Sequence, residues 1–377
     1  MTNRWRRALT VALTPVLVLA ACGHDSRRRA TAQPRSHPST TRTTTRVERS
    51  ADNVYAHTEV GQVSPAVAGV PARVYVPNSE SDTIDVIDPT SFQIVDHFAV
   101  GRLPQHVTPS WDLKTLYVDN DLGNSLTPID PRTGRAGAPI PVTDPYNLYF
   151  TPDGTKAIVV AEKFRRLDFR DPHTWKLLKS VPIPHSGVDH GDFSADGKEM
   201  LLSCEFSGFV VRVDVERMVV TADLHVGGSP VDVKLAPDGS VYYVANQTRN
   251  GVSVIDADSM TEQRFIPTGK GAHGLYPSRD TRSLYVSNRL AGSVSVIDFA
   301  SQRVTATWQI GGSPDMGGVS ADGTQLWLTG RYHKEVYVID TRTGQLLRRI
   351  PVGAGPHGLS VFPQPGRYSL GHTGAFR

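Results

Sequence analysis

Histidine and aspartate recur at one position of a repeated sequence. The two residues that follow a short Gly/Pro-rich stretch carry a polar side chain in every copy. In chain order these pairs are Gln105-His106, Tyr146-Asn147, Asp189-His190, Val231-Asp232, His273-Gly274, Asp315-Met316 and His357-Gly358. Four of the thirteen histidines of the chain fall in this set, together with three aspartates. Imidazoles and carboxylates that converge on one site can bind a metal ion or a haem iron, or can transfer protons.

The repeat itself has a regular period. The residues before these pairs lie 41 to 43 positions apart, at Pro104, Pro145, Val188, Pro230, Ala272, Pro314 and Pro356. Each unit contains short runs rich in Val, Ile and Tyr, such as YYVAN and VSVID, separated by Asp-Gly or Thr-Gly turns. These runs predict four strands per unit. Four strands in a period of about 40–45 residues are typical of a β-propeller blade, so we predict an all-β propeller.

The fold prediction places the polar pairs in space. The first strand of each propeller blade lines the central channel, so the pairs should surround the mouth of that channel. The candidate ligand-binding residues at the mouth are His106, Asn147, Asp189, His190, Asp232, His273, Asp315 and His357. A structural alternative is that the histidines cap tight turns and that the polar groups are simply hydrated. Cys204, near His190 and His372 on the same rim, is expected to be an inert buried thiol. The catalytic residues and any metal ligands stay unassigned.

The number of blades is harder to predict than the fold. Residues 54–377 exceed seven units of 42 residues and fall slightly short of eight. We favour eight blades, with a split closing blade that takes two inner strands from the C-terminus and an outer strand from residues 54–60. RYSLGH (367–372) then counts as a second strand. The alternative is seven blades, in which residues 357–362 supply the inner strand of the first blade and the C-terminal tail packs outside.

The second-strand motifs YVDN, YVAN and YVSN resemble those of the YVTN-type β-propeller family. The resemblance covers residues 54–377 and implies the fold. Similar repeats occur in periplasmic and surface binding proteins, in lactonase-like propellers and in the haem d1 domain of cytochrome cd1 nitrite reductase. Because one propeller architecture hosts many activities, the resemblance does not imply a particular function. No CxxCH motif is present, which argues against a covalent c-type haem domain.

The N-terminus has the pattern of an export signal. Residues 1–21 combine a positive start, containing Arg4, Arg6 and Arg7, with an apolar stretch too short to span a membrane. The stretch ends in Leu-Ala-Ala-Cys-Gly, which looks like a bacterial lipobox and makes Cys22 the predicted lipidation site. The alternative is an ordinary secretory signal. Residues 22–53 are rich in Thr, Ser, Arg and Pro and predict a disordered tether. Residues 54–377 form the single propeller domain.

Composition narrows the function classes. The chain has a net charge of +3, with much of the basic excess before residue 50, so nucleic acid is not an expected partner. No Gly-rich phosphate loop, nucleophile elbow or His-Glu-x-x-His motif occurs. We therefore expect an extracytoplasmic binding protein, lipid-anchored in the bacterial envelope, whose channel mouth binds a small ligand or an envelope protein. The alternative is an enzyme or redox protein that binds haem d1, a metal ion or a lactone-like substrate through the His/Asp ring.

Overall fold

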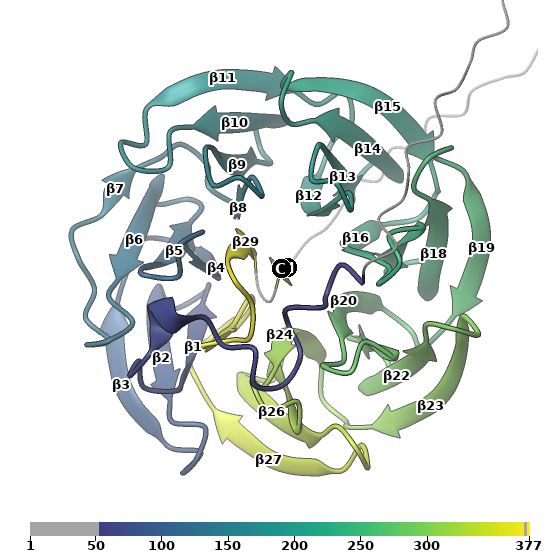
Figure 1. The fold of residues 1–377 in the computed structure, drawn as a ribbon. Helices are drawn as coiled ribbons and strands as arrows, with labels where there is room; N and C mark the ends of the chain where they lie inside the picture. Colours follow the sequence, from purple (N-terminus) through teal and green to yellow (C-terminus); the bar gives the residue numbers. More distant parts are fainter. Residues whose placement is uncertain (1–52, 373–374) are drawn as a thin grey trace, which may run out of the picture. The chain divides into compact units, whose positions relative to one another are not determined.

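The repeats fold into seven antiparallel β-sheets arranged around a common axis (Figure 1). The computed structural model describes residues 53–372 and 375–377. Each sheet is a blade with four strands in sequential order from the axis outward, and one blade is extended by two further strands. The prediction of an all-β propeller is confirmed. No helix of the described residues has the length and apolar character to cross a membrane.

Six blades are continuous in sequence, and the seventh joins the two ends of the chain. We number them from the closing blade. Blade 1 contains β28 (Ser360–Phe362), β1 (Arg73–Asn78), β2 (Thr83–Ile87) and β3 (Ile94–Ala99). Blade 2 contains β4 (Pro104–Pro109), β5 (Leu116–Asn120), β6 (Ser125–Ile129) and β7 (Ile140–Pro141). Blade 3 contains β8 (Asn147–Phe150), β9 (Ala157–Ala161), β10 (Arg166–Arg170) and β11 (Leu177–Pro182).

The remaining four blades repeat the same order. Blade 4 contains β12 (Val188–Phe193), β13 (Glu199–Cys204), β14 (Phe209–Asp214) and β15 (Val219–His225). Blade 5 contains β16 (Pro230–Leu235), β17 (Val241–Asn246), β18 (Gly251–Asp256) and β19 (Glu262–Pro267). Blade 6 contains β20 (Ala272–Pro277), β21 (Ser283–Asn288), β22 (Ser293–Asp298) and β23 (Arg303–Gln309). Blade 7 contains β24 (Pro314–Val319), β25 (Gln325–Gly330), β26 (Glu335–Asp340) and β27 (Leu346–Pro351).

Burial follows the position of a strand within its blade. Every residue of the inner strand β16 and of its neighbour β17 is buried, whereas the outer strand β23 alternates between exposed and half-buried residues. The inner strands are buried on both faces because each blade packs against the next. Between blades 6 and 7, for example, Tyr276 and Tyr285 pack in one cluster with Leu326 and Leu328. A blade therefore buries its faces only as part of the ring.

The repeated Asp and Asn residues have structural roles in the turns. In the outer hairpins a carboxylate accepts from the backbone two residues on, as Asp340 Oδ1 does from Arg342 N at 3.0 Å. The Asp-Gly turns place their glycines at positive φ, +75° at Gly323, where a side chain would be strained. The motif asparagines brace loops: Asn288 Nδ2 donates to Ser293 and Ser295 at 3.2 and 3.0 Å. These residues therefore have structural reasons to recur.

The prediction of eight blades is wrong, and the seven-blade alternative matches the structure. Residues 54–60 form no strand, because the segment crosses one end of the ring as turns and Tyr55 Oη donates to Leu235 O at 2.8 Å. The inner strand of blade 1 comes from the C-terminus, with Ser360 opposite Tyr75. The extra length that suggested an eighth blade is therefore divided between an N-terminal segment and a C-terminal tail.

The tail, described for residues 367–372 and 375–377, lies at the axis and not outside the ring as the seven-blade alternative assumed (Figure 1). It forms β29 (Ser369–Gly371) and β30 (Ala375–Phe376), and Gly371 pairs with Tyr149 of β8. Arg377 Nη2 donates to Asp192 Oδ1 at 3.0 Å, and its guanidinium stacks on Tyr55, 4.7 Å from the ring centroid. Leu370 and Ala375 join the core cluster between blades 3 and 4. The tail therefore fills part of the channel with side chains.

Candidate functional site

A β-bulge marks the candidate pairs in five of the seven blades. In blade 4, Val188 is opposite Cys204 and Gly191 is opposite Leu202, so Asp189 and His190 together face only Ser203. The same two-against-one register follows Pro104, Pro230, Ala272 and Pro314. Such bulges interrupt the ladder and redirect side chains. The inner strands thus release two residues from regular pairing where the sequence carries His and Asp.

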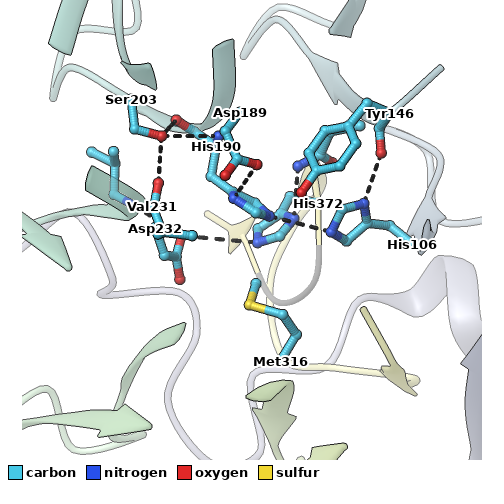
Figure 2. Close-up of polar contacts among 12 residues, drawn as sticks. His106, Tyr146, Asp189, His190, Ser203, Val231, Asp232, Met316 and His372 are labelled. Carbon is cyan, nitrogen blue, oxygen red and sulfur yellow. Dashed lines mark hydrogen bonds and ion pairs between the residues drawn. The ribbon is translucent and has the colours of Figure 1, made fainter. Parts of the chain in front are cut away.

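Three imidazoles meet at the axis beside these bulges (Figure 2). His106 comes from β4, His190 from β12 and His372 from the C-terminal tail, and all three are 0% exposed. One ring nitrogen of each lies within 4.8 Å of the corresponding nitrogens of the other two, a spacing that could hold a metal ion. Nε2 of His106 and Nε2 of His190 are 3.2 Å apart. We call these three residues the histidine cluster.

Neighbouring groups orient each ring of the histidine cluster. His106 Nδ1 lies 2.8 Å from Tyr146 O; because a carbonyl only accepts, Nδ1 carries the proton and Nε2 keeps its lone pair. Asp189 Oδ1 lies 2.6 Å from His190 Nδ1, an ion-pair distance, although the two groups are not aligned for a hydrogen bond. Asn147 Nδ2 donates to His372 Nδ1 at 3.2 Å, which places the proton of neutral His372 on Nε2. Metal-binding histidines typically donate the proton of the second ring nitrogen to an acceptor, as His106 does to Tyr146 O.

Burial keeps the cluster neutral. Removal from water, the largest cause in each case, lowers the pKa of His190 to about 4 and holds those of His106 and His372 well below the ordinary value. The imidazoles also lower one another's pKa, because protonation of one disfavours a positive charge on the next. Metal coordination requires neutral imidazole, and this environment supplies it at neutral pH.

A second group at the mouth is held by ion pairs. Asp315 Oδ1 accepts from Arg289 Nε at 2.8 Å and lies 3.1 Å from His273 Nδ1, while its Oδ2 is 2.9 Å from His357 Nδ1. Arg289 also contacts Nε2 of His273. Burial opposes ionisation of Asp315, but the charge of Arg289 and the two histidines outweigh it and hold the pKa of that carboxyl well below its usual range. We call these four residues the ion-pair group.

The other residues selected from the sequence lie outside the histidine cluster and the ion-pair group. Asp232 Oδ2 accepts from Leu275 N of the next blade at 2.8 Å, and its Oδ1 lies 3.3 Å from Lys234 Nζ and 3.9 Å from His372 Nε2. Cys204 is buried, and burial raises its thiol pKa to about 12, which fits the predicted inert thiol. Cys22, the predicted lipidation site, lies outside the described residues.

His372 is the residue that sequence reasoning did not select as a ligand. The sequence places it in RYSLGH, which resembled a second strand of an eighth blade. Its position at the axis follows from the tail turning back into the channel, and no repeat encodes that path. The usable signal was a histidine close to the C-terminus of a chain whose repeats already closed at residue 362.

The rim of the mouth has two electrostatic halves. Residues that directly follow second strands are acidic in blades 2 to 4, at Asp121, Glu162 and Glu205, and basic in blades 6 and 7, at Arg289 and Arg331. Burial, followed by the charge of Asp189, raises the pKa of Glu162 to about 8 and that of Glu205 to about 7. Beyond this rim lie exposed apolar side chains: Leu122, Phe164, Phe206, Leu290 and Tyr332, which are 45, 50, 67, 63 and 61% exposed.

Two surface hollows lie elsewhere. One of about 540 Å³ is lined by residues 53, 54, 56 and 57, by the Asp196-Gly197 turn and by Tyr368 and Arg377. This turn is at the far end of β12 from His190, so the hollow opens opposite the mouth. The other, of about 360 Å³, adjoins Gln62 and Arg367. Neither hollow is lined by the histidine cluster.

The histidine cluster does not fit haem d1. The ring centroids of His106 and His190 are 5.2 Å apart, those of His190 and His372 4.6 Å, and those of His106 and His357 5.0 Å. Side chains at these separations touch, so no macrocycle can lie between them with the tail in place. A single ion of atomic size fits the geometry better.

These features define a seven-bladed β-propeller whose axis is lined by histidines. The chain belongs to the YNCE-like β-propeller family, whose model matches residues 54–367. This assignment agrees with the resemblance of the repeats to YVTN-type propellers. No curated protein sequence matches the chain.

Solved structures share the fold at low sequence identity. A functionally unknown protein from Desulfotomaculum acetoxidans is 17% identical, with a TM-score of 0.67, and the match covers 77% of this chain and 98% of that one. Dihydro-heme d1 dehydrogenase NirN is 16% identical, with a TM-score of 0.60 and coverage of 76% and 74%. A putative 6-phosphogluconolactonase from Bacteroides uniformis is 16% identical, with a TM-score of 0.63 and coverage of 77% and 99%. These likenesses show the fold alone.

Proposed function

We propose that this chain is a metal-binding propeller of the bacterial envelope, and that the histidine cluster holds a first-row transition-metal ion. The observation that carries the proposal is the convergence of three buried ring nitrogens within 4.8 Å of one another. Three imidazoles suit Zn²⁺, Cu²⁺, Ni²⁺ or Co²⁺ better than Mg²⁺ or Ca²⁺, which prefer oxygen ligands. Three protein ligands also leave a coordination position for a ligand from outside.

The arrangement of lone pairs supports the proposal. His106 directs the lone pair of Nε2 at His190 because its Nδ1 proton is directed to Tyr146 O. Nε2 of His190 lies 3.2 Å from the nitrogen that carries that lone pair, so either a proton on His190 or a cation beside the two nitrogens satisfies it. Buried polar groups without partners are rare in proteins. Within the described residues both carboxylate oxygens of Asp189 lack a hydrogen-bond donor.

Metal titration of the purified mature protein tests the proposal. Wild-type protein, freed of metal with a chelator, should bind one Zn²⁺ or Co²⁺ per chain in calorimetry and elemental analysis. Alanine at His106, His190 or His372 should weaken binding about 100-fold or more, because each substitution removes one of three ligands. His57→Ala is the matched control, since His57 is exposed and outside the cluster. Equal binding by wild type and all three cluster variants would contradict the proposal.

We also propose that the propeller is exported and anchored to the membrane through a lipid on Cys22. The support is the lipobox-like end of the apolar N-terminal stretch and the polar segment that follows it. The exposed apolar side chains around the mouth give such an anchored propeller a face for an envelope protein partner, since exposed aromatic residues are enriched where proteins dock.

Substitution of the proposed anchor residue has a simple expected result. Cys22→Ser should move the protein from the membrane fraction to the soluble extracytoplasmic fraction, because the lipid would no longer be attached. Immunoblots of fractionated cells measure the change. Finding the wild-type chain entirely in the soluble fraction would refute the anchor.

A further inference from the structure

Arg331, a half-buried arginine on the rim of the mouth, has one buried nitrogen without a hydrogen-bond partner among the described residues. Arg331 directly follows β25, at the position in blade 7 that Arg289 occupies in blade 6. The two differ in their contacts. Arg289 is paired with Asp315, with Nη2 2.5 Å from Oδ1, whereas Nη1 of Arg331 is buried and has no hydrogen-bond partner among the described residues. A buried hydrogen-bond donor without an acceptor is costly unless a ligand supplies one.

The charge of Arg331 acts on the channel interior. It is the largest charge effect on His357 and lowers the pKa of that imidazole, and it also lowers the pKa of His106. The rings of His106 and His357 are in contact, with centroids 5.0 Å apart. The charge of Arg331 therefore acts on His357 and on His106, whose rings touch.

The carboxylates near the site do not balance a bound cation. Asp315 is committed to Arg289, and Asp232 lies 3.3 Å from Lys234 Nζ. Two nearby buried carboxyl groups of the described set are not paired with Lys or Arg: Asp189, 2.6 Å from His190, and Asp119, which faces His106 across the bulge of blade 2. A divalent ion on three neutral imidazoles, together with Arg331, would carry three positive charges against at most these two carboxyl groups. Buried charge of one sign favours binding of the other.

We propose that the metal-loaded site binds a small anion, a carboxylate or an inorganic oxyanion, as a further ligand of the metal, and that Arg331 donates hydrogen bonds to it. The proposal rests on the proposed metal-binding function. It joins the open coordination position of a three-histidine site to an arginine that has one buried nitrogen without an acceptor among the described residues. Nothing is transferred or oxidised in this step; the anion enters the coordination sphere, and its charge offsets that of the ion.

Absorption spectroscopy of the Co²⁺-loaded mature protein tests this inference. Adding formate or azide should shift the visible Co²⁺ bands of the wild type with a saturable dependence on anion concentration. Arg331→Gln should weaken the anion about 10-fold or more, since it removes a charge-assisted hydrogen bond. The same variant should bind Co²⁺ at least as tightly as the wild type, because a positive charge near the cation is lost. Arg342→Gln, an exposed arginine on the outer edge of blade 7, is the matched control and should behave as the wild type.

The outcomes separate this inference from the proposed function. Failure of the wild type to bind Co²⁺ would overturn both. Tight Co²⁺ binding with no spectral response to either anion would overturn the anion site alone. An anion response equal in wild type and Arg331→Gln would show that Arg331 does not hold the anion, and would also overturn the inference as stated.

Discussion

Asp315→Asn is expected to destabilise the propeller by about 3–5 kcal/mol in denaturant unfolding. Asp315 is 0% exposed and contacts Arg289, His273 and His357. Asparagine has nearly the same shape but no charge, so the substitution leaves the Arg289 guanidinium buried without a counter-charge. The cost of an uncompensated buried charge far exceeds the small loss of packing.

A double-mutant cycle separates charge from shape. Arg289→Gln in the Asp315→Asn background removes the orphaned charge, so the double variant should be less destabilised than the sum of the two single variants, by about 1–3 kcal/mol. Additive effects would show that the ion pair contributes nothing beyond the individual contacts of each side chain.

Two buried groups are expected to change stability with pH in opposite directions. Burial lowers the pKa of His357 to about 3, below its value of about 6.5 in the unfolded chain. The stabilisation from neutral His357 is therefore complete above pH 6.5 and is lost as pH falls toward the pKa in the folded protein. Between pH 7 and pH 5 this lowers the free energy of unfolding by about 2 kcal/mol. Burial raises the pKa of Glu162 to about 8 from about 4.5. The stabilisation from protonated Glu162 is therefore complete below its pKa in the unfolded chain, about 4.5, and is lost as pH rises through its pKa in the folded protein, about 8.

Comparison of variants with the wild type isolates each group, since other carboxylates and imidazoles also titrate. The destabilisation of His357→Gln relative to wild type should shrink by about 2 kcal/mol between pH 7 and 5. Glu162→Gln should instead gain about 1–2 kcal/mol relative to wild type between pH 5 and 8, a value reduced for the partial exposure of that residue. Urea unfolding at four pH values measures both trends. Parallel stability curves for all three proteins would refute the assigned burial effects.

The architecture could be predicted from the sequence because propeller blades encode it locally. Three sequence features indicate the same four-stranded unit: the period of the repeat, the YVDN-type strands and the Asp-Gly turns. Because they agree, the fold could be identified. The predicted number of blades was wrong because the length of the chain does not show which residues pair as strands in a sheet. Residues 54–60 and 367–372 have strand-like patterns, but one crosses the end of the ring and the other enters the channel.

The candidate site was predictable only where it follows the repeat. The first-strand pairs occupy equivalent places in the repeat, which is why His106, His190, His273 and His357 could be selected together, and the structure brings these four to the axis. The sequence did not show which of these histidines belong to the neutral histidine cluster and which belong to the ion-pair group. That difference arises from Arg289, which directly follows a second strand, and from His372, which comes from the tail.

The position of His372 makes the site depend on a segment that belongs to no blade repeat. The inner strand of blade 1 closes the ring with residues 360–362, and the third imidazole follows ten residues later in a segment that lies along the axis. Cleavage near residue 366 would leave the strands of all seven blades in place and remove one of the three proposed ligands. The stability of the ring and the integrity of the cluster can therefore be lost separately.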